Sequence, residues 1–318
     1  MRSYITSRLK SVALWLTGMT AVVEFLVHGK KAKLGLTILC YHRIAEGIPE
    51  EAPCDPFNVS PGTFEEQLSA LQSIRGLRVV SAKTVAEFLE SPTVSPGSYL
   101  LITFDDGYQN NLRAAKILND KDLPAVIFVV TDYIGKPIFD FNTWDVWCRG
   151  LPNANVTWYR PVTVTECQEL LKLGMEIQLH GHTHRPLGSL DSDDLDEEIK
   201  ASKAAIEGLG AGDAMALAYP YGSSRAGHFN QQVEACLKKN GIRFGLATDA
   251  GTNPLPELES LAYRLRRIPI HEHDRGLLFQ AKAAGYCGIL PLVKALAYRL
   301  GAWTRVPPRA AKHEPTLT

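Results

Sequence analysis

Short apolar runs alternate with segments of helical periodicity from residue 35 to residue 275. The apolar runs, which predict buried strands, cover residues 36–40, 99–104, 125–130, 175–179, 214–218 and 242–247. Segments with apolar residues at helical spacing lie between them, at residues 60–71, 82–89, 110–118, 165–173, 195–209 and 229–239. This alternation predicts an α/β fold with a largely parallel sheet or barrel.

Polar side chains follow these runs at their carboxyl ends. Asp105 and Asp106 come directly after the run 99–104, and three histidines follow the run 175–179. Because the carboxyl ends of parallel strands share one rim, where α/β active sites form, we expect these groups to converge. The residues expected at this rim are Tyr41, His42, Asp105, Asp106, His180, His182, His184, Tyr219, Pro220, Tyr221, His271 and His273.

The spacing of the histidines is typical of a divalent-metal site. His180 and His184 stand four residues apart, which on a helical turn brings both imidazoles within reach of one cation. Two imidazoles and one carboxylate suit Zn²⁺ first, with Co²⁺, Ni²⁺, Mn²⁺ or Fe²⁺ as alternatives. Three protein ligands leave a position open for water or substrate. The alternative interpretation is a set of solvated loop histidines beside a helix cap formed by Asp105 and Asp106.

Several motifs carry a family resemblance. TFDDG at residues 103–107, HGHTH at residues 180–184 and AYPYG at residues 218–222 resemble the first three motifs of the polysaccharide deacetylases of the NodB-homology family. LCYHR at residues 39–43 and VSPGTFEEQLSAL at residues 59–71 resemble the exopolysaccharide-processing branch of that family. The resemblance implies an irregular (β/α) barrel with helical N- and C-terminal extensions.

The resemblance, which covers residues 36–275, also implies an activity. It implies a metal-dependent hydrolase that removes N-acetyl groups from amino sugars of a bacterial polysaccharide or its lipid-linked precursor. Asp105 would be the general base toward water activated by the metal, and the backbone N–H of Tyr221, after Pro220, would donate to the oxyanion. The implied metal ligands are Asp106, His180 and His184.

The chain also departs from the family pattern. Ala218 stands where many members carry an arginine that orients the base, so the sequence does not explain how Asp105 is held. The fourth motif, an aspartate with a tryptophan four residues on, is missing after Asp249. His271 fits the general acid of the fifth motif, with His273 as a competitor. The alternative for His271 is a rim histidine bonded to a neighbouring carboxylate.

Aromatic residues near the rim are candidates for sugar contacts, because flat rings pack against sugar faces. We expect Tyr41 and His42 to line the sugar cleft, with Pro220 and Tyr221 also touching substrate. Residues 135–161 form a polar and aromatic insert that suits a substrate-facing loop. Its aromatic residues, which either face the cleft or belong to the core, are Phe139, Phe141, Trp144 and Trp147.

Both ends of the chain are expected to lie outside a deacetylase domain at residues 35–275. Residues 1–34 hold an apolar run with basic flanks that is too short to span a bilayer. They predict an amphipathic helix that lies on an anionic membrane surface or packs on the domain, with a secretory signal or anchor as the alternative. Residues 276–303 predict an apolar helical segment, and residues 304–318 a disordered tail.

Composition narrows the function classes. Lys and Arg together number 34, as do Asp and Glu, so the chain lacks a global basic field and we expect no nucleic-acid partner. A hydrophobic content of 45% excludes a disordered or fibrous protein. Six scattered cysteines favour reduced thiols, hence the cytoplasm or the periphery of the inner membrane. The usual substrates of the family make the periplasm the alternative compartment.

The leading hypothesis is therefore a hydrolase of carbon–nitrogen amide bonds, a polysaccharide N-deacetylase. One alternative is a deformylase or deacylase of another sugar or lipid-sugar, and the other is a catalytically weak carbohydrate-binding relic. The presence of both Asp105 and the predicted ligands favours an enzyme, because a binding module needs no base beside a metal.

Overall fold

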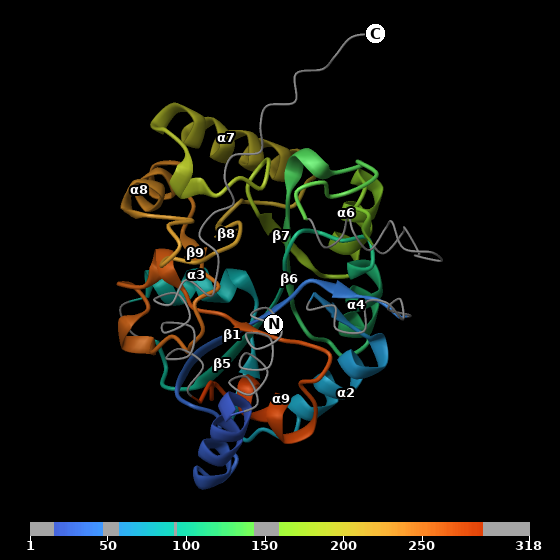
Figure 1. Cartoon of the computed structure of the whole chain (residues 1–318), viewed down its shortest axis with the longest axis vertical. Helices are drawn as coiled ribbons and strands as arrows, with labels where there is room; N and C mark the ends of the chain where they lie inside the picture. The colour runs from blue at the N-terminus through green and yellow to red at the C-terminus, as the bar shows by residue number, and fades with distance from the viewer. Residues whose placement is uncertain (1–15, 47–56, 92–93, 143–158, 289–318) are drawn as a thin grey trace, which may run out of the picture.

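The computed structural model describes residues 16–46, 57–91, 94–142 and 159–288. Within them, eight parallel strands form one curled sheet (Figure 1). In spatial order these are β10 (Ile268–Pro269), β1 (Gly35–Tyr41), β5 (Ser98–Phe104), β6 (Val126–Val129), β7 (Glu176–Leu179), β8 (Ala216–Ala218) and β9 (Phe244–Leu246), with β4 (Leu77–Val79) beside β5. The expected parallel α/β sheet is confirmed, and β4 is a strand that the hydrophobic pattern did not predict.

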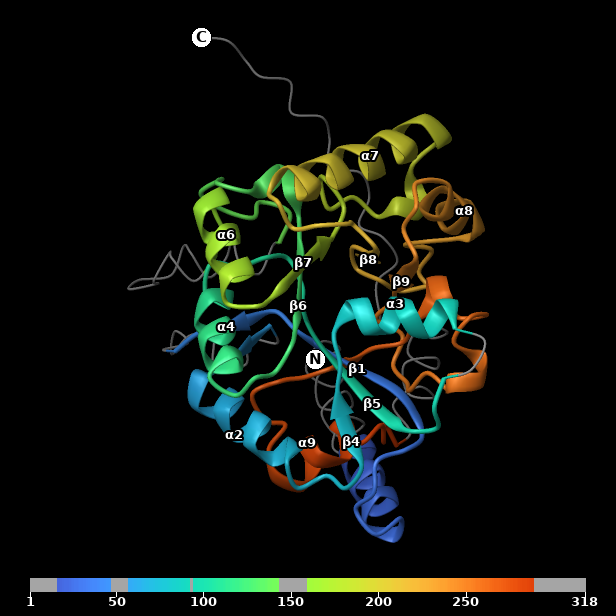
Figure 2. The ribbon, with the colours of Figure 1, turned by 180° about the vertical axis from the view of Figure 1, so that it is seen from behind.

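Helices surround this sheet, as the two opposite views in Figures 1 and 2 show. They are α2 (Pro61–Leu71), α3 (Ala82–Glu90), α4 (Asn111–Asn119), α6 (Val164–Lys172), α7 (Ser192–Gly208), α8 (Gln231–Lys239) and α9 (Gly276–Ala283). Short 3₁₀ turns are η1 (Thr131–Tyr133), η3 (Leu187–Ser189), η4 (Leu255–Glu257) and η5 (Ala262–Arg264), and β2 (Arg43–Ile44) pairs with β3 (Asn58–Val59). All six predicted helices are present.

Capping chemistry explains several of these helix boundaries. Ser60 accepts a hydrogen bond from the backbone N–H of Thr63, and Pro61 is the first residue of α2, as its sequence predicts. At α6, Thr163 and Glu166 form a reciprocal capping box. Gly174 follows that helix with a φ of +79°, the conformation that stops a helix and turns the chain into β7.

The strands of the sheet are buried on both faces. Leu39 and Ile102 belong to the outer face, which packs against α2, α4, α6, α7 and α8. Ile38 and Leu101, one position away on the same strands, belong to the inner face, which packs against α3. This double burial explains why β1 and β5 are continuous apolar runs rather than alternating ones.

The inner rows of side chains end in polar groups at the carboxyl end of the sheet. Side chains of a strand alternate between faces, so the row that holds Ile38 continues to His42, and the row that holds Leu101 continues to Asp105. His180 ends the corresponding row of β7. The period of the strands therefore delivers these three groups to the same mouth of the barrel.

Residues 16–27 form a helix that packs on the domain, at the lower end of Figure 1 beside α9. Thr17, Ala21 and Phe25 are its buried residues, and the ring of Phe25 lies 5.7 Å from that of Tyr286. The other face of this helix is apolar and exposed, with Leu16, Met19, Val23 and Leu26. In the described residues, no helix is long and apolar enough to cross a bilayer.

Some expectations fall outside the described residues. These are the side chains of Trp144 and Trp147, the helical segment beyond residue 288, the tail at residues 304–318 and the first fifteen residues of the N-terminal segment. Within the described part, α9 opens the expected helical segment after residue 275.

Candidate active site

Asp105 at the end of β5 is held by a buried arginine. The guanidinium of Arg267 donates from Nη1 to Oδ1 of Asp105 at 2.6 Å and from Nη2 to Oδ2 at 2.7 Å. Its Nε–H donates to the carbonyl oxygen of Ala247 at 3.0 Å. Arg267 is 0% and Asp105 2% exposed, so this bidentate pair is fully shielded from solvent.

The charge state of Asp105 follows from this pair. Burial by itself raises the pKa of the carboxyl group, but the charge of Arg267 and its hydrogen bonds outweigh burial and lower the pKa to about 2. The carboxylate is therefore ionised across the physiological range and fixed in one orientation.

Arg267 orients Asp105 in place of the arginine that many family members carry where this chain has Ala218. The guanidinium that orients Asp105 comes from the residue before β10 rather than from the end of β8. β10 lies next to β1, which lies next to β5, and this strand order brings Arg267 to Asp105. Sequence reasoning missed this residue because Arg266 and Arg267 look alike in the sequence, whereas only Arg267 is buried.

The three predicted metal ligands are brought together. Nε2 of His180 lies 3.3 Å and Nε2 of His184 lies 3.5 Å from Oδ1 of Asp106. All three side chains are buried. Asp106 and His184 have φ values of +72° and +61°. Both therefore have the left-handed backbone conformation, which residues other than glycine rarely adopt. These turns aim the carboxylate and the second imidazole at one point.

This donor set fits a divalent cation. Ligand atoms at the corners of a tetrahedron with metal bonds of about 2.1 Å lie about 3.4 Å apart, which matches the two separations from Asp106. Nδ1 of His180 lies 2.8 Å from the carbonyl oxygen of Ala218 and must carry the proton, because a carbonyl only accepts. Nε2 of His180 is thereby directed at the cation position.

The pKa shifts of Asp106 and His184 suit a cation. At His180 burial lowers the pKa, but the charges of Asp105 and Asp106 outweigh burial and raise it. Burial raises the pKa of Asp106, yet hydrogen bonds from His180 and His184 outweigh it and hold the pKa well below its usual value. Burial lowers the pKa of His184, which favours the neutral imidazole that binds metals. The ring of Phe141 stacks on His184 at 3.8 Å and fixes the plane of that imidazole.

A buried glutamate that sequence reasoning missed organises the turn between the two histidines. Oε1 of Glu198 accepts from the backbone N–H groups of His182 at 2.8 Å and Thr183 at 2.7 Å. Oε2 accepts from the hydroxyl of Thr183 at 2.9 Å and from Arg185 at 3.3 Å. Glu198 lies on the buried stripe of α7 beside Ile199, and a carboxylate on such a stripe is the signal that could have found it.

Glu198→Ala is expected to weaken binding of Zn²⁺ to the chain by roughly tenfold to a hundredfold, as losses of groups that orient metal ligands do. Two backbone N–H groups would lose their acceptor, and the left-handed turn at His184 would relax. Competition of the chain with a chromophoric chelator measures this affinity. Asp194→Asn is the control, since Asp194 bonds Arg185 on the exposed side. Unchanged zinc affinity in Glu198→Ala would contradict the positioning role.

The expectation for Tyr41 is wrong. Its side chain is 1% exposed and lies on the outer face of the sheet, where its ring is 5.3 Å from that of Phe64 on α2. Its hydroxyl donates to Oε1 of Gln67 at 3.0 Å. The reason is the strand period: Tyr41 follows Leu39 on the outer row, whereas His42 follows Cys40 on the inner row.

His42 lies at the site with Cys40. Sγ of Cys40 is 3.5 Å from Oδ2 of Asp105, and the three residues together offer ligand atoms within 4.8 Å of one another. A cation is disfavoured there, because Arg267 occupies both oxygens of Asp105. Burial lowers the pKa of His42, so its imidazole is neutral beside the Asp105 carboxylate.

His271 follows β10 at the same end of the sheet as His42. Its backbone N–H donates to Oδ2 of Asp274 at 2.8 Å, and Asp274 also accepts from Lys282 at 2.6 Å. The neighbouring carboxylate of Glu272 is turned away, toward Ser60 and α2. The imidazole of His273 is 69% exposed, and that of His271 is half-buried. The role of His271 as general acid stays a prediction.

The turn that holds Pro220 and Tyr221 packs beside the histidine turn. Tyr221 has a φ of +60°, and its ring lies 4.8 Å from that of His184. At 40% exposed, Tyr221 is among the few large apolar side chains at the surface of the described structure.

Phe139 belongs to a small core with Tyr133, as one of the two alternatives predicted.

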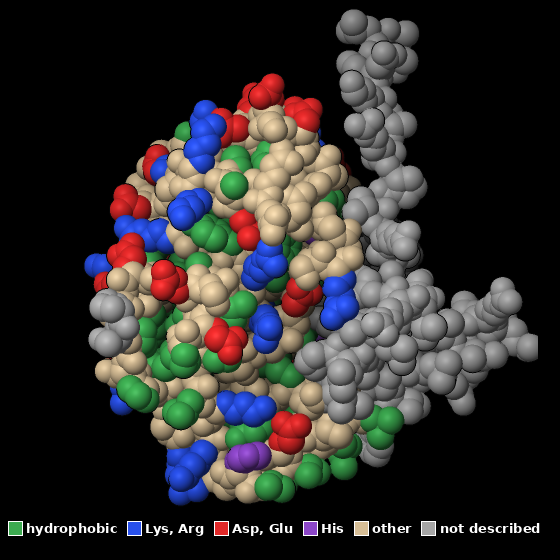
Figure 3. Space-filling model, turned by 90° about the vertical axis from the view of Figure 1, so that its left-hand side faces the viewer, with side chains coloured by type: hydrophobic (Ala, Val, Ile, Leu, Met, Phe, Trp, Pro, Cys, Tyr) green, Lys and Arg blue, Asp and Glu red, His purple; other side chains and the backbone are tan. Residues whose placement is uncertain are grey.

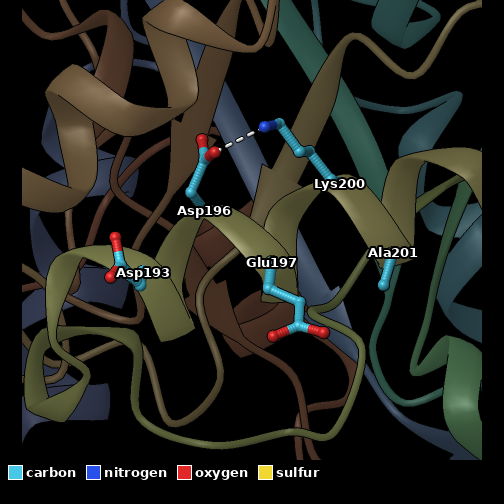
Figure 4. Close-up of a pocket in the computed structure, with 5 residues that line it drawn as sticks. All are labelled: Asp193, Asp196, Glu197, Lys200 and Ala201. Atoms are coloured by element: carbon cyan, nitrogen blue, oxygen red, sulfur yellow. Dashed lines mark ion pairs between the residues drawn. The ribbon is translucent and has the colours of Figure 1, made fainter.

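A hollow lies on the surface of α7 (Figure 4). It has a volume of about 380 Å³, and Asp193, Asp196 and Glu197 give it an acidic lining. Asp196 is already paired with Lys200 at 2.6 Å. No residue of the candidate site lines this hollow.

Known proteins resemble the chain in sequence. Residues 94–245 match the model of a family described as polysaccharide deacetylase. The matched segment contains Asp105 and Tyr221 but ends before Arg267 and His271. The chain is also 23% identical over 253 residues to YxkH of Bacillus subtilis (strain 168), which is itself assigned as a polysaccharide deacetylase. That alignment covers 79% of this chain and 76% of YxkH.

Two solved structures share the fold, each with a TM-score of 0.61. One is the Streptococcus pyogenes deacetylase PplD in complex with acetate, at 22% identity over 77% of this chain and 95% of PplD. The other is IcaB from Ammonifex degensii, at 19% identity over 80% of this chain and 98% of IcaB. These likenesses confirm the expected irregular (β/α) barrel.

Proposed function

Since the chain belongs to the polysaccharide deacetylase family of NodB homology, whose members hydrolyse amide bonds, we propose that it removes N-acetyl groups from amino sugars of a bacterial polysaccharide. The observation that carries this proposal is the adjacency of two units at one mouth of the barrel. One is the ionised, oriented Asp105, and the other is the trio of Asp106, His180 and His184.

The trio would hold a divalent cation, with Zn²⁺ as the first choice for two imidazoles and a carboxylate. When bound, the cation would polarise the acetyl carbonyl and make a nearby water more acidic. Asp105 takes the proton of the attacking water. With a pKa of about 2 the carboxylate is a weak base on its own, so this proton transfer depends on the acidified water.

Three further residues complete the proposed mechanism. The backbone N–H of Tyr221, in its left-handed turn, donates to the developing oxyanion. His271 gives a proton to the departing amine. His42, neutral and beside Asp105, contacts the sugar. The acetate bound in the similar PplD structure supports acetyl as the acyl group over formyl.

The experiment is acetate release from N-acetylglucosamine oligomers by the purified chain as isolated, after chelation, and after return of Zn²⁺ or Co²⁺. We expect release to disappear on chelation and to recover with metal. Tight metal binding without acetate release would contradict the proposed substrate but not the assigned fold. Release of formate from formylated sugars would then identify the alternative deacylase. Absence of both metal binding and turnover would favour the carbohydrate-binding relic.

A further inference from the structure

The helix at residues 16–27 has two unlike faces. Small and aromatic residues on one face pack on the domain, and a Cβ added at Gly18 would lie 3.2 Å from Leu278 of α9. The opposite face carries large apolar side chains into solvent. Their exposed fractions are 44% for Leu16, 47% for Met19, 53% for Val23, 44% for Leu26 and 76% for Val27.

This apolar stripe, defined as Leu16, Met19, Val23, Leu26 and Val27, is unusual for the molecule. Only four other large apolar side chains reach comparable exposure among the described residues. A contiguous exposed patch marks an interaction surface rather than ordinary surface variation. The sequence before residue 16 repeats the pattern, with Ile5, Leu9, Val12 and Trp15 at the same helical spacing.

Basic residues border the stripe where the helix ends. His28, Lys30, Lys31 and Lys33 follow it directly and are exposed. Arg75 joins them from the loop before β4, since its guanidinium donates to the carbonyl oxygen of Gly29 at 2.6 Å. Figure 3 shows hydrophobic and basic side chains gathered at this lower end of the molecule. Glu24, the acidic residue of the described helix, is already paired with Lys33 at 3.4 Å.

We propose that this stripe and its basic border bind the surface of an anionic lipid bilayer, with the helix lying in the membrane plane. Apolar side chains would enter the acyl boundary while Lys30, Lys31 and Arg75 meet lipid phosphates. Ala21 and Phe25 bury one face of the helix against the domain, so the helix would present its other face to the lipid and lie on the bilayer surface.

A second copy of the chain fits this surface less well. The acidic face of α7 would match the lysines in charge, but α7 exposes no large apolar side chain among the described residues. Such a partner would leave the apolar stripe in water. A lipid surface satisfies both features at once, because it offers negative headgroups above an apolar interior.

Binding in this way places the active site away from the bilayer. The helix leads into the first residue of β1, Gly35, whereas Asp105 and His42 lie at the opposite end of the sheet. Seven residues of strand separate the two ends by about 20 Å. The mouth of the barrel therefore faces away from the lipid, so vesicle binding leaves turnover of soluble oligomers unchanged. The membrane proposal does not rest on the deacetylase reaction.

Flotation of the full chain with vesicles tests the proposal. We expect partition onto phosphatidylglycerol-containing vesicles to exceed that onto pure phosphatidylcholine vesicles at least tenfold, and to fall at 1 M salt, where screening shortens to about 3 Å. Met19→Ser with Val23→Ser, and separately Lys30→Glu with Lys31→Glu, should each lower partition at least tenfold. These variants should retain the circular dichroism spectrum and melting temperature of the parent chain.

Matched controls sit at the far end of the molecule. Val164→Ser removes an apolar side chain of 51% exposure, and Lys238→Glu with Lys239→Glu reverses two adjacent charges on α8. Both controls should bind vesicles like the parent. A parent chain that ignores anionic vesicles overturns the proposal, as does equal loss in the controls. Dimers that Met19→Ser with Val23→Ser dissociates, without vesicle binding, would assign the stripe to a second copy instead.

Discussion

Asp105→Asn is expected to lower acetate release by about 10²- to 10⁴-fold, the usual contribution of a positioned base. Asparagine fills the same space, but it cannot take a proton from water. Asp106, His180 and His184 are untouched, so the affinity for Zn²⁺ should stay within a few-fold of the parent. Initial rates on N-acetylglucosamine oligomers and a zinc titration measure the two effects on the same preparation.

The buried neighbour of Asp105 requires a control of its own. In Asp105→Asn the guanidinium of Arg267 stays buried without its countercharge, which by itself destabilises the fold. The double variant Asp105→Asn with Arg267→Met removes both charges and should recover much of the lost stability. Its rate should stay as low as that of the single variant. Recovery of turnover in the double variant would show that Asp105 serves to neutralise Arg267 rather than to accept a proton.

Much of the fold follows from local rules along the chain. Apolar runs bounded by polar residues mark the strands, and capping residues such as Ser60 and Thr163 mark helix starts. The convergence of Asp105 with His180 also follows, because parallel strands share one carboxyl edge. The two-residue strands β2 and β3 were not predicted, because their pairing, not their own sequence, defines them.

The errors have physical causes of two kinds, one local and one long-range. Tyr41 and His42 are adjacent in sequence, yet the strand period sends only His42 to the inner row. Arg267 and Glu198 act on the site from 162 and 15 to 16 residues away in sequence, through contacts that depend on strand order and on the packing of α7. A single sequence gives no such distances in space, so these two contacts could not be predicted, although the buried stripe of α7 marks Glu198 as an unusual carboxylate.

Arg267→Met is expected to lower the free energy of unfolding by about 3–5 kcal/mol near neutral pH, since it leaves a buried carboxylate without its partner. Arg267→Lys keeps a charge but not the two parallel hydrogen bonds, so its loss should be smaller. Urea unfolding of the chelated protein at pH 7.5 measures both changes. Arg266→Met is the matched control, because Arg266 is exposed beside the same strand and should leave the free energy of unfolding nearly unchanged.

The pH dependence of the stability lost in Arg267→Met distinguishes an electrostatic effect from a packing effect. In the parent chain the folded pKa of Asp105 is about 2 against an ordinary 3.8, so the pair stabilises fully above pH 3.8 and loses its effect as pH falls toward 2. Without Arg267, burial raises the pKa of Asp105 above 3.8, and the folded variant gains a proton on acidification. The stability difference between Arg267→Met and the parent should therefore narrow from pH 7.5 to pH 4.5. A difference that is constant across this range would assign the loss to the missing packing of the arginine side chain, and Asp105 would then need another source of its low pKa.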